Sequence, residues 1–242
     1  ADFVLRKMKR RDGRLMHRYA DGHVAVPGFV EDYAFFTLGL CDLYEATFNP
    51  HYLREAKSLA QEMVRLFWDE AGGGFFITGH DAESLIVRPK EFYDGAVPSG
   101  NSVAALALAR LARLTMDKSL EDYARRTVEA ASQPLSRYPS QFPEMLMALD
   151  FLLGPSREIV IAGDEDQVLE KALEEIYTRF LPNKVVIFRP SEGGHAQELH
   201  ELVPFLKNLL PHNGQTTVYV CKNYVCELPV TDMAKLPALL DS

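Results

Sequence analysis

Three carboxylates in two separate stretches are the residues best suited to chemistry in this sequence. Glu31 and Asp32 open an apolar stretch with helical periodicity, and Asp94 lies in a loop-forming stretch rich in glycine. Two carboxyl groups in one cleft can divide acid and base work, and their separation decides whether a water fits between a carboxylate and a sugar carbon. We therefore predict Asp32 or Glu31 as the catalytic acid or base, with Asp94 as its companion.

The stretch around Asp94 also supplies groups that could bind a polar substrate. It runs from Arg88 to Ser102 and offers guanidinium, amide and hydroxyl groups together. Arg88 is a candidate anchor for a carboxylated or phosphorylated sugar, and an aromatic ring such as that of Tyr93 could stack on a sugar ring. The predicted substrate-binding residues are Arg88, Tyr33, Tyr93, Asn101 and Ser102.

A structural explanation stays open for most of these groups. Carboxylates in the first turn of a helix interact favourably with its positive end, which would account for Glu31 and Asp32. Ser99 and Asn101 can cap the helix that follows them. Arg88 and its neighbour Lys90 can pair with Glu91 and Asp94 instead of a substrate.

The elements that must position these residues are mostly helices. Apolar side chains recur at helical spacing over 29–44, 52–67, 102–114, 120–128 and 141–153, and the first four stretches form two αα-hairpins. The small residues of 102–114 allow neighbouring helices to approach closely. Turn signals predict one β-hairpin over 14–26 and a second that joins 75–78 to 85–87.

The pattern changes after residue 155. Strands over 158–162 and 184–188 enclose an amphipathic helix over 167–180, which predicts a βαβ unit with a parallel strand pair. A helix near 199–209, a strand over 216–221 and a last helix capped by Thr231 complete the chain. The acidic turn 163–166 is interpreted as a helix cap and not as a phosphate loop.

These elements predict a mainly α fold with a small appended α/β layer. The alternating helix pairs favour an α-toroid or a solenoid. The expected parts are a helical-hairpin region (1–155), the α/β layer (156–222) and a C-terminal helical segment (223–242) that returns to the hairpins.

Composition excludes several classes of function. The 242 residues carry 26 basic and 34 acidic side chains, for a net charge of −8, so binding to nucleic acid is not expected. The basic run over 6–11 is interpreted as a solvated strand or linker. No apolar run reaches the roughly 20 residues that span a membrane, and residues 1–13 lack the apolar segment of a signal peptide.

The cysteines and histidines favour neither a cofactor nor a metal. Cys41, Cys221 and Cys226 are predicted to form no disulfide framework, which favours a reducing, cytoplasmic location. Four residues separate Cys221 from Cys226, which is neither the spacing of a redox pair nor, without a second pair, a convincing zinc site. The histidines form no array typical of catalytic metal sites.

Several motifs together resemble a known family, the spermatogenesis-associated, thioredoxin-domain-containing proteins, in their C-terminal part. The match extends over nearly the whole chain, and the joint occurrence of its motifs is specific. The motifs are Pro27 to Phe36, Asp42 to Phe48, Gly73 to Phe76, Asp94 to Val103, Pro182 to Val185, and Cys221 to Cys226 followed by Pro229 to Asp232.

The resemblance implies a fold and a range of functions. Members resemble, in their helical part, the (α/α)6 toroids of six-hairpin glycosidases and N-acylglucosamine 2-epimerase, preceded by a thioredoxin-like domain. This chain would hold about half of such a toroid, with a sugar-binding or sugar-processing pocket. The alternative is a non-catalytic scaffold or a redox-partner module for the thioredoxin-like domain. Half a toroid leaves an apolar face uncovered, so we expect self-association or binding to the missing half.

Overall fold

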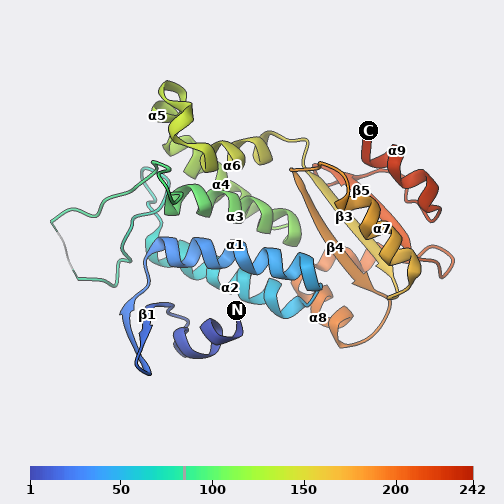
Figure 1. Ribbon diagram of the computed structural model, residues 1–242, viewed down its shortest axis with the longest axis horizontal. Helices are drawn as coiled ribbons and strands as arrows, with labels where there is room; N and C mark the ends of the chain where they lie inside the picture. Colours follow the sequence, from blue (N-terminus) through green and yellow to red (C-terminus); the bar gives the residue numbers. More distant parts are fainter. Residues whose placement is uncertain (84–85, 242) are drawn as a thin grey trace.

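A computed structural model describes residues 1–83 and 86–241 of the chain. Helical hairpins and a small sheet lie side by side along the longest axis of the molecule (Figure 1). The fold is mainly α with an appended α/β part, as predicted, while the toroid stays a prediction. The helices of the hairpin part are α1 (Val30–Thr47), α2 (Pro50–Phe67), α3 (Gly100–Thr115), α4 (Lys118–Ala130), α5 (Ser132–Arg137) and α6 (Pro143–Leu153).

Helix α3 is the centre of this part. It packs against α1, α4 and α6, and every residue of α3 except Arg110 is buried. Its alanines leave room for three neighbouring helices, as the sequence predicted. The αα-hairpins α1/α2 and α3/α4 turn tightly at Phe48 and Met116, both in the left-handed region.

The α/β part contains a four-stranded sheet in the order β4-β3-β5-β6. Strands β3 and β4 are parallel, as the predicted βαβ unit requires, and β5 is antiparallel to β3. The carboxylate of Asp166 accepts hydrogen bonds from the N–H groups of Val168 and Leu169, so the acidic turn caps α7 as predicted. The elements are β3 (Arg157–Gly163), α7 (Gln167–Tyr177), β4 (Lys184–Pro190), α8 (Gly194–Leu202), β5 (Thr217–Lys222), β6 (Val225–Cys226) and α9 (Leu236–Asp241).

The two faces of this sheet pack into two different hydrophobic cores. Val160, Val185 and Ile187 join the core of the helical part. Their neighbours Ile159 and Val186 point the other way, into a second core with α7 and α9. The α/β layer is therefore packed directly on the helical hairpins.

Several sequence-based expectations differ from this structure. Residues Val4–Met8 form a short π-helix, so the first half of the basic run is helical and not a strand or linker. Lys9 forms an isolated bridge with Leu15. Asp232, and not Thr231, caps the short 3-10 helix Met233–Lys235 ahead of α9, where it accepts the N–H of Ala234. Helix α9 packs on α7 and β5, whereas we expected the C-terminal segment on the helical hairpins.

The first predicted β-hairpin is confirmed and the second is not. Strands β1 (Met16–Ala20) and β2 (His23–Pro27) pair antiparallel around a turn at Asp21 and Gly22. Of the second hairpin, Leu85 lies outside the described residues. Phe75 forms an isolated bridge with Trp68, and the described residues of 75–78 and 86–87 belong to no strand.

Candidate functional site

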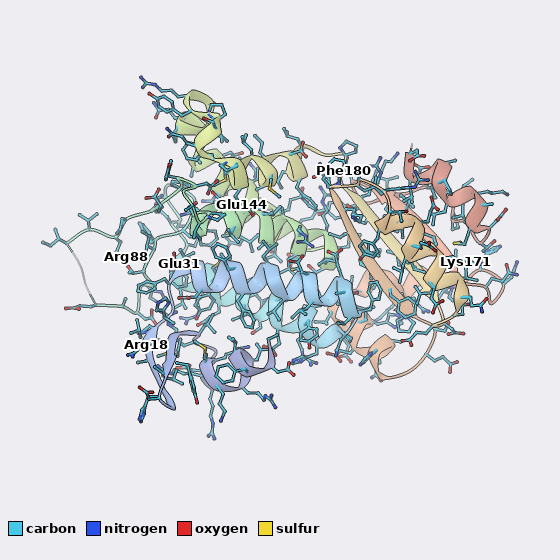
Figure 2. All side chains as sticks on the ribbon, viewed as in Figure 1. Arg18, Glu31, Arg88, Glu144, Lys171 and Phe180 are labelled. Atoms are coloured by element: carbon cyan, nitrogen blue, oxygen red, sulfur yellow. A yellow bond between two sulfur atoms is a disulfide. The ribbon has the colours of Figure 1, made fainter. Side chains whose placement is uncertain are left out.

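The N-terminal ends of α1, α3 and α6 lie at one end of the helical part. The Cα of Gly100, at the start of α3, comes so close to α1 that a side chain there would meet the backbone N of Glu31 at 3.1 Å. Asp94 joins the start of α6 to the loop that precedes α3. Arg88 lies in the loop that extends beyond this end of the molecule, and Glu144 lies in the first turn of α6 (Figure 2).

A surface hollow of about 740 Å³ opens at the start of α1, and we call it the loop-end hollow. Two predicted catalytic residues, Glu31 and Asp32, lie in its wall beside the rings of Phe35 and Phe36. Asp94 is not among its lining residues, which are Val4, Met8, Leu15, Met16, Glu31, Asp32, Phe35, Phe36 and Val97. The structure thus brings the two adjacent carboxylates together with apolar and aromatic side chains.

The two carboxylates of this hollow have different surroundings. Asp32 accepts a hydrogen bond of 2.8 Å from the N–H of Phe29, at the start of α1, and lies 3.0 Å from the Nδ1 atom of His17. Glu31 is exposed and makes no hydrogen bond or ion pair with any part of the chain that the structure describes. Asp32 therefore stabilises the helix start, while the carboxylate of Glu31 is open to solvent.

Asp94, the predicted companion, is buried and serves as a structural acceptor. One carboxylate oxygen accepts the N–H of Ser99 at 2.9 Å. The other accepts the N–H groups of Glu144 and Met145 at 2.9 and 3.2 Å, and so caps α6 from a distant part of the chain. Burial and the negative charge of Asp94 raise the pKa of Glu144.

Three predicted substrate-binding residues are fully buried, namely Tyr33, Asn101 and Ser102. The hydroxyl of Tyr33 accepts hydrogen bonds from the N–H of Leu15 and from the guanidinium of Arg14. Asn101 is fully buried and bonds both the N–H and the carbonyl of Phe75, as well as the carbonyl of Glu91. Asn101 therefore links the loop to α3, and the predicted capping role falls to Ser99 alone, whose hydroxyl accepts the N–H of Ser102.

The remaining predicted groups lie along the loop. Arg88 donates to the carbonyl of Thr78 at 2.6 Å and lies 4.3 Å from the centre of the Phe76 ring. Tyr93 is exposed. Lys90 pairs with Asp69 at 2.6 Å, whereas we expected Glu91 or Asp94 as its partner, and this hydrogen bond lowers the pKa of Asp69. The catalytic and substrate-binding roles of these residues stay predictions.

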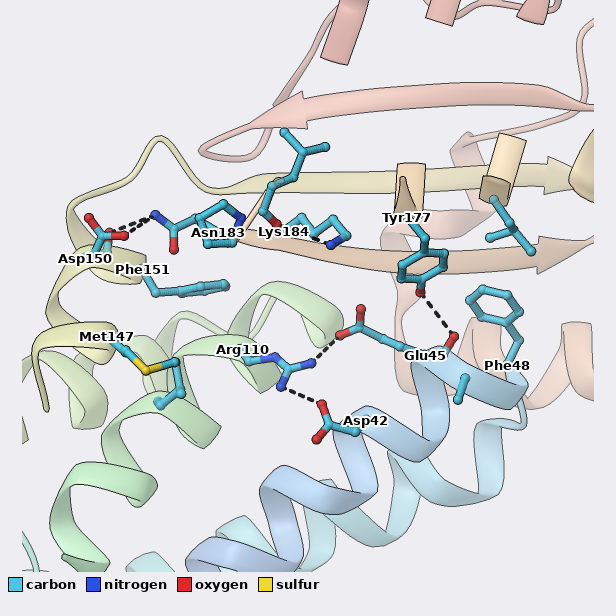
Figure 3. Close-up of a pocket in the computed structure, with 15 residues that line it drawn as sticks. Asp42, Glu45, Phe48, Arg110, Met147, Asp150, Phe151, Tyr177, Asn183 and Lys184 are labelled. Carbon is cyan, nitrogen blue, oxygen red and sulfur yellow. Dashed lines mark hydrogen bonds and ion pairs between the residues drawn. The ribbon is translucent and has the colours of Figure 1, made fainter. Parts of the chain in front are cut away.

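A second hollow, of about 580 Å³, lies where α1, α3 and α6 meet α7 and β4, and we call it the seam cavity (Figure 3). Its charged and polar lining residues are Asp42, Glu45, Arg110, Asp150, Tyr177, Asn183 and Lys184, and its apolar ones are Ala46, Phe48, Leu106, Met147, Phe151, Leu173, Leu181 and Pro182. No site was predicted here from the sequence. The sequence signals for this cavity were two charged residues within apolar helices, Glu45 in α1 and Arg110 in α3.

A network of donors and acceptors crosses the seam cavity. Arg110 donates to Asp42 at 2.7 Å and to Glu45 at 2.8 Å. Glu45 also accepts the N–H of Val186 on β4, at 3.3 Å, so it ties the sheet to the helices. Burial raises the pKa of Glu45 against the opposing charge of Arg110, and burial raises the pKa of Tyr177 to about 12.

The cysteines differ from the prediction. Cys221 and Cys226 face each other across the β5–β6 turn and form a disulfide, and Cys41 is a buried free thiol. The expectation that the cysteines form no disulfide is therefore wrong for this pair, because the turn brings two residues five positions apart to one place. A cytoplasmic location stays a prediction, and it has lost its support from the cysteines.

Two general features can be stated for the described residues. No group of three or more His, Cys, Asp or Glu side chains in residues 1–83 and 86–241 is arranged to hold a metal ion. Of the helices that the structure describes, none has the length and apolar character needed to cross a membrane.

Comparison with known proteins finds relatives in mammals and in a nematode. Spermatogenesis-associated protein 20 of Homo sapiens and of Rattus norvegicus are each 39% identical to this chain over 215 residues, which cover 88% of this chain. An uncharacterized protein of Caenorhabditis elegans is 28% identical over 221 residues. No family model matches the chain.

These similarities support the resemblance seen in the motifs, within a clear limit. The match covers 27% of the human and rat proteins and 29% of the Caenorhabditis elegans protein. The chain thus spans little more than a quarter of the length of the curated relatives it matches. Their names describe no reaction, so the family is one of poorly defined function.

Proposed function

We propose that this chain is the C-terminal part of a protein of the spermatogenesis-associated protein 20 family, and that its helical hairpins are about half of an (α/α)6-type toroid with a carbohydrate pocket. The observation that carries the proposal is the loop-end hollow. It combines the open carboxylate of Glu31, the Asp32–His17 pair and the rings of Phe35 and Phe36.

The chemistry of this hollow suits a sugar. Glycosidases use a pair of carboxylates at the bond that they break, and sugar rings pack on apolar and aromatic side chains. In this proposal Glu31, which has no partner among the described residues, is the acid or base. Asp32 is its companion, held in place by the N–H of Phe29. The reaction is hydrolysis of a glycosidic bond or epimerisation of a free sugar.

The roles that we predicted for the neighbouring loop become supporting ones in this proposal. Asp94 and Asn101 hold the loop against α6 and α3 through backbone groups. The loop in turn contributes Val97 to the wall of the hollow. Arg88 and Tyr93 remain candidates for contact with a larger saccharide.

Calorimetry with a panel of mono- and disaccharides tests the proposal. We expect a sugar that binds the wild-type chain and binds Glu31→Gln at least tenfold more weakly. Glu174→Gln, a matched change on the exposed side of α7, should bind as the wild type does. Flat titrations of the folded wild-type chain with the whole panel would overturn the carbohydrate pocket.

A second candidate function is a redox-partner module for a thioredoxin-like domain. The observation that favours it is the Cys221–Cys226 disulfide, because Cys226 is exposed while Cys221 is buried. A thioredoxin thiolate would attack Cys226 and release the thiolate of Cys221. The second thioredoxin cysteine would then release Cys226 as a thiol, leaving the thioredoxin oxidised and this chain reduced.

Trapping the intermediate tests this second candidate. A thioredoxin whose second cysteine is replaced by serine cannot complete the exchange, so a mixed disulfide at Cys226 should accumulate and be visible by mass spectrometry. Cys226→Ser should form no adduct at this hairpin. If the intact chain gives no adduct either, the redox-partner function is wrong.

A further inference from the structure

One cation of the seam cavity, Lys184, has no carboxylate within ion-pair distance among the described residues. Lys184 lies at the start of β4 and is partly buried in the cavity wall. Its ammonium donates to the carbonyl of Leu181 at 3.3 Å and lies 5.2 Å from the centre of the Tyr177 ring. In residues 1–83 and 86–241 it forms no ion pair with a carboxylate within 4.0 Å. Burial lowers the pKa of Lys184, and the more distant charge of Glu45 opposes this shift. An ammonium has three N–H donors, so most of its hydrogen-bonding capacity is unused.

The carboxylates around the cavity already have donors. Glu45 accepts from Arg110 and from the N–H of Val186. Asp42 accepts from Arg110, and Asp150 accepts from the amide of Asn183 at 2.7 Å (Figure 3). The groups that still lack hydrogen-bond partners are therefore donors, which favours an anionic ligand over a cationic one.

Arg110 can also turn toward such an anion. It is the single residue of α3 that is not buried, and it lies in the cavity wall. Its bond to Glu45 is buried, but the side chain of Asp42 is 62% exposed, and exposed ion pairs contribute little to stability. An incoming carboxylate can replace Asp42 at the guanidinium without leaving a buried charge unpaired.

The rest of the wall is apolar. Leu106 and Phe151 are buried behind it, and Met147 is 55% exposed at its edge. A volume of about 580 Å³ is within the range of small-molecule sites. A ligand with a carboxylate near Lys184 and an apolar body against these side chains would match both the charged and the apolar parts of the cavity wall.

We propose that the seam cavity is a binding site for a small organic acid with an apolar body, anchored by Lys184 and Arg110. This site is separate from the loop-end hollow, so it does not depend on the proposed carbohydrate function. The bound acid would touch α3, α6 and β4 together and would therefore stabilise the packing of the α/β layer on the helical hairpins.

Octanoate is a suitable probe, with octanamide as its uncharged counterpart. Calorimetry should find one octanoate per chain and at least tenfold weaker binding of octanamide, since an ion-paired hydrogen bond is lost. Lys184→Met should weaken octanoate binding about tenfold or more, while Lys184→Arg keeps most of it. Lys171→Met, a matched loss of charge on the exposed face of α7 (Figure 2), should change nothing.

A second pair of variants keeps the test valid if changes at Lys184 disturb folding. Met147 is largely exposed, so Met147→Glu and Met147→Gln should both fold. The added negative charge of Met147→Glu should repel octanoate. Met147→Gln adds no charge, so it should bind octanoate several-fold more tightly than Met147→Glu does. Equal affinity for octanoate and octanamide, or equal affinity of the two Met147 variants for octanoate, would overturn the proposed acid site.

Discussion

The carboxylate of Asp94 accepts a hydrogen bond of 2.9 Å from the backbone N–H of Glu144, fifty positions further along the chain. The first N–H groups of a helix have no partner within the helix. Asp94 supplies that partner for α6 from outside it, and its other oxygen holds the N–H of Ser99 ahead of α3. One side chain thus ties together two helix starts.

Asp94→Ala should destabilise the chain by about 1–2 kcal/mol, as the loss of a helix cap does, because buried N–H groups lose their acceptor. Urea unfolding followed by circular dichroism measures the change. Asp164→Ala, at an exposed position, is the control. An unfolding free energy equal to that of the wild type would contradict the capping role of Asp94.

Asn101→Leu should cost more, about 2–4 kcal/mol, since it leaves the N–H and carbonyl of Phe75 and the carbonyl of Glu91 without partners in a buried site. Thermal unfolding compared with Asn208→Leu, at an exposed position, gives the difference. If the two variants melt together, Asn101 does not hold the loop.

The cysteines should react in a defined order. Burial raises the pKa of the Cys41 thiol to about 12, so the folded chain should take up no iodoacetamide at neutral pH. Denaturant alone should expose one reactive thiol, and denaturant with a reductant should expose three. Mass spectrometry counts the adducts. Three adducts without reductant would mean that Cys221 and Cys226 are not bonded.

Glu144 should make stability depend on pH. Burial and the charge of Asp94 raise its pKa above the ordinary value of 4.5, so the folded chain holds this proton more tightly than the unfolded chain. The stabilisation of the folded chain by protonated Glu144 is complete below pH 4.5, and it is lost as the pH rises through the raised pKa of Glu144.

The comparison of the wild type with Glu144→Gln isolates this effect from that of other groups. The unfolding free energy of the wild type, relative to that of Glu144→Gln, should fall as the pH rises from 4 to 7. The exposed control Glu174→Gln should follow the wild type over the same range. A pH-independent difference between the wild type and Glu144→Gln would contradict the raised pKa.

The exposed apolar side chains near the loop-end hollow should make the chain associate. Phe35 and Val97 line the hollow and are 40% and 68% exposed. Light scattering should detect a dimer or a larger species, and the double change Phe35→Ser with Val97→Ser should shift it toward the monomer. A wild-type chain that remains a folded monomer over the whole concentration range would contradict the expectation.

The local elements were largely predictable because their signals are local. Helical spacing of apolar residues, the turn at Asp21-Gly22 and the cap at Asp166 each depend on a few neighbouring positions. The helical half of the basic run was not predicted, because charges indicate a solvated segment but not whether that segment is helical.

Contacts between residues far apart in the sequence could not be predicted from it. Periodicity does not say which partner a buried amide or carboxylate meets. Asn101 was therefore predicted to bind substrate and Asp94 to be catalytic, although each bonds the backbone of another segment. The seam cavity was missed because its residues come from five elements that meet only after folding.

The sequence by itself determined the helical hairpins, the parallel strand pair and the acidic cap of α7, since propensity, spacing and capping act over a few residues. Only the tertiary structure decided which polar groups are used inside the protein and which face a hollow. That choice depends on burial and on partners far along the chain, and it is why Glu31 stays open while Asp94 holds α6.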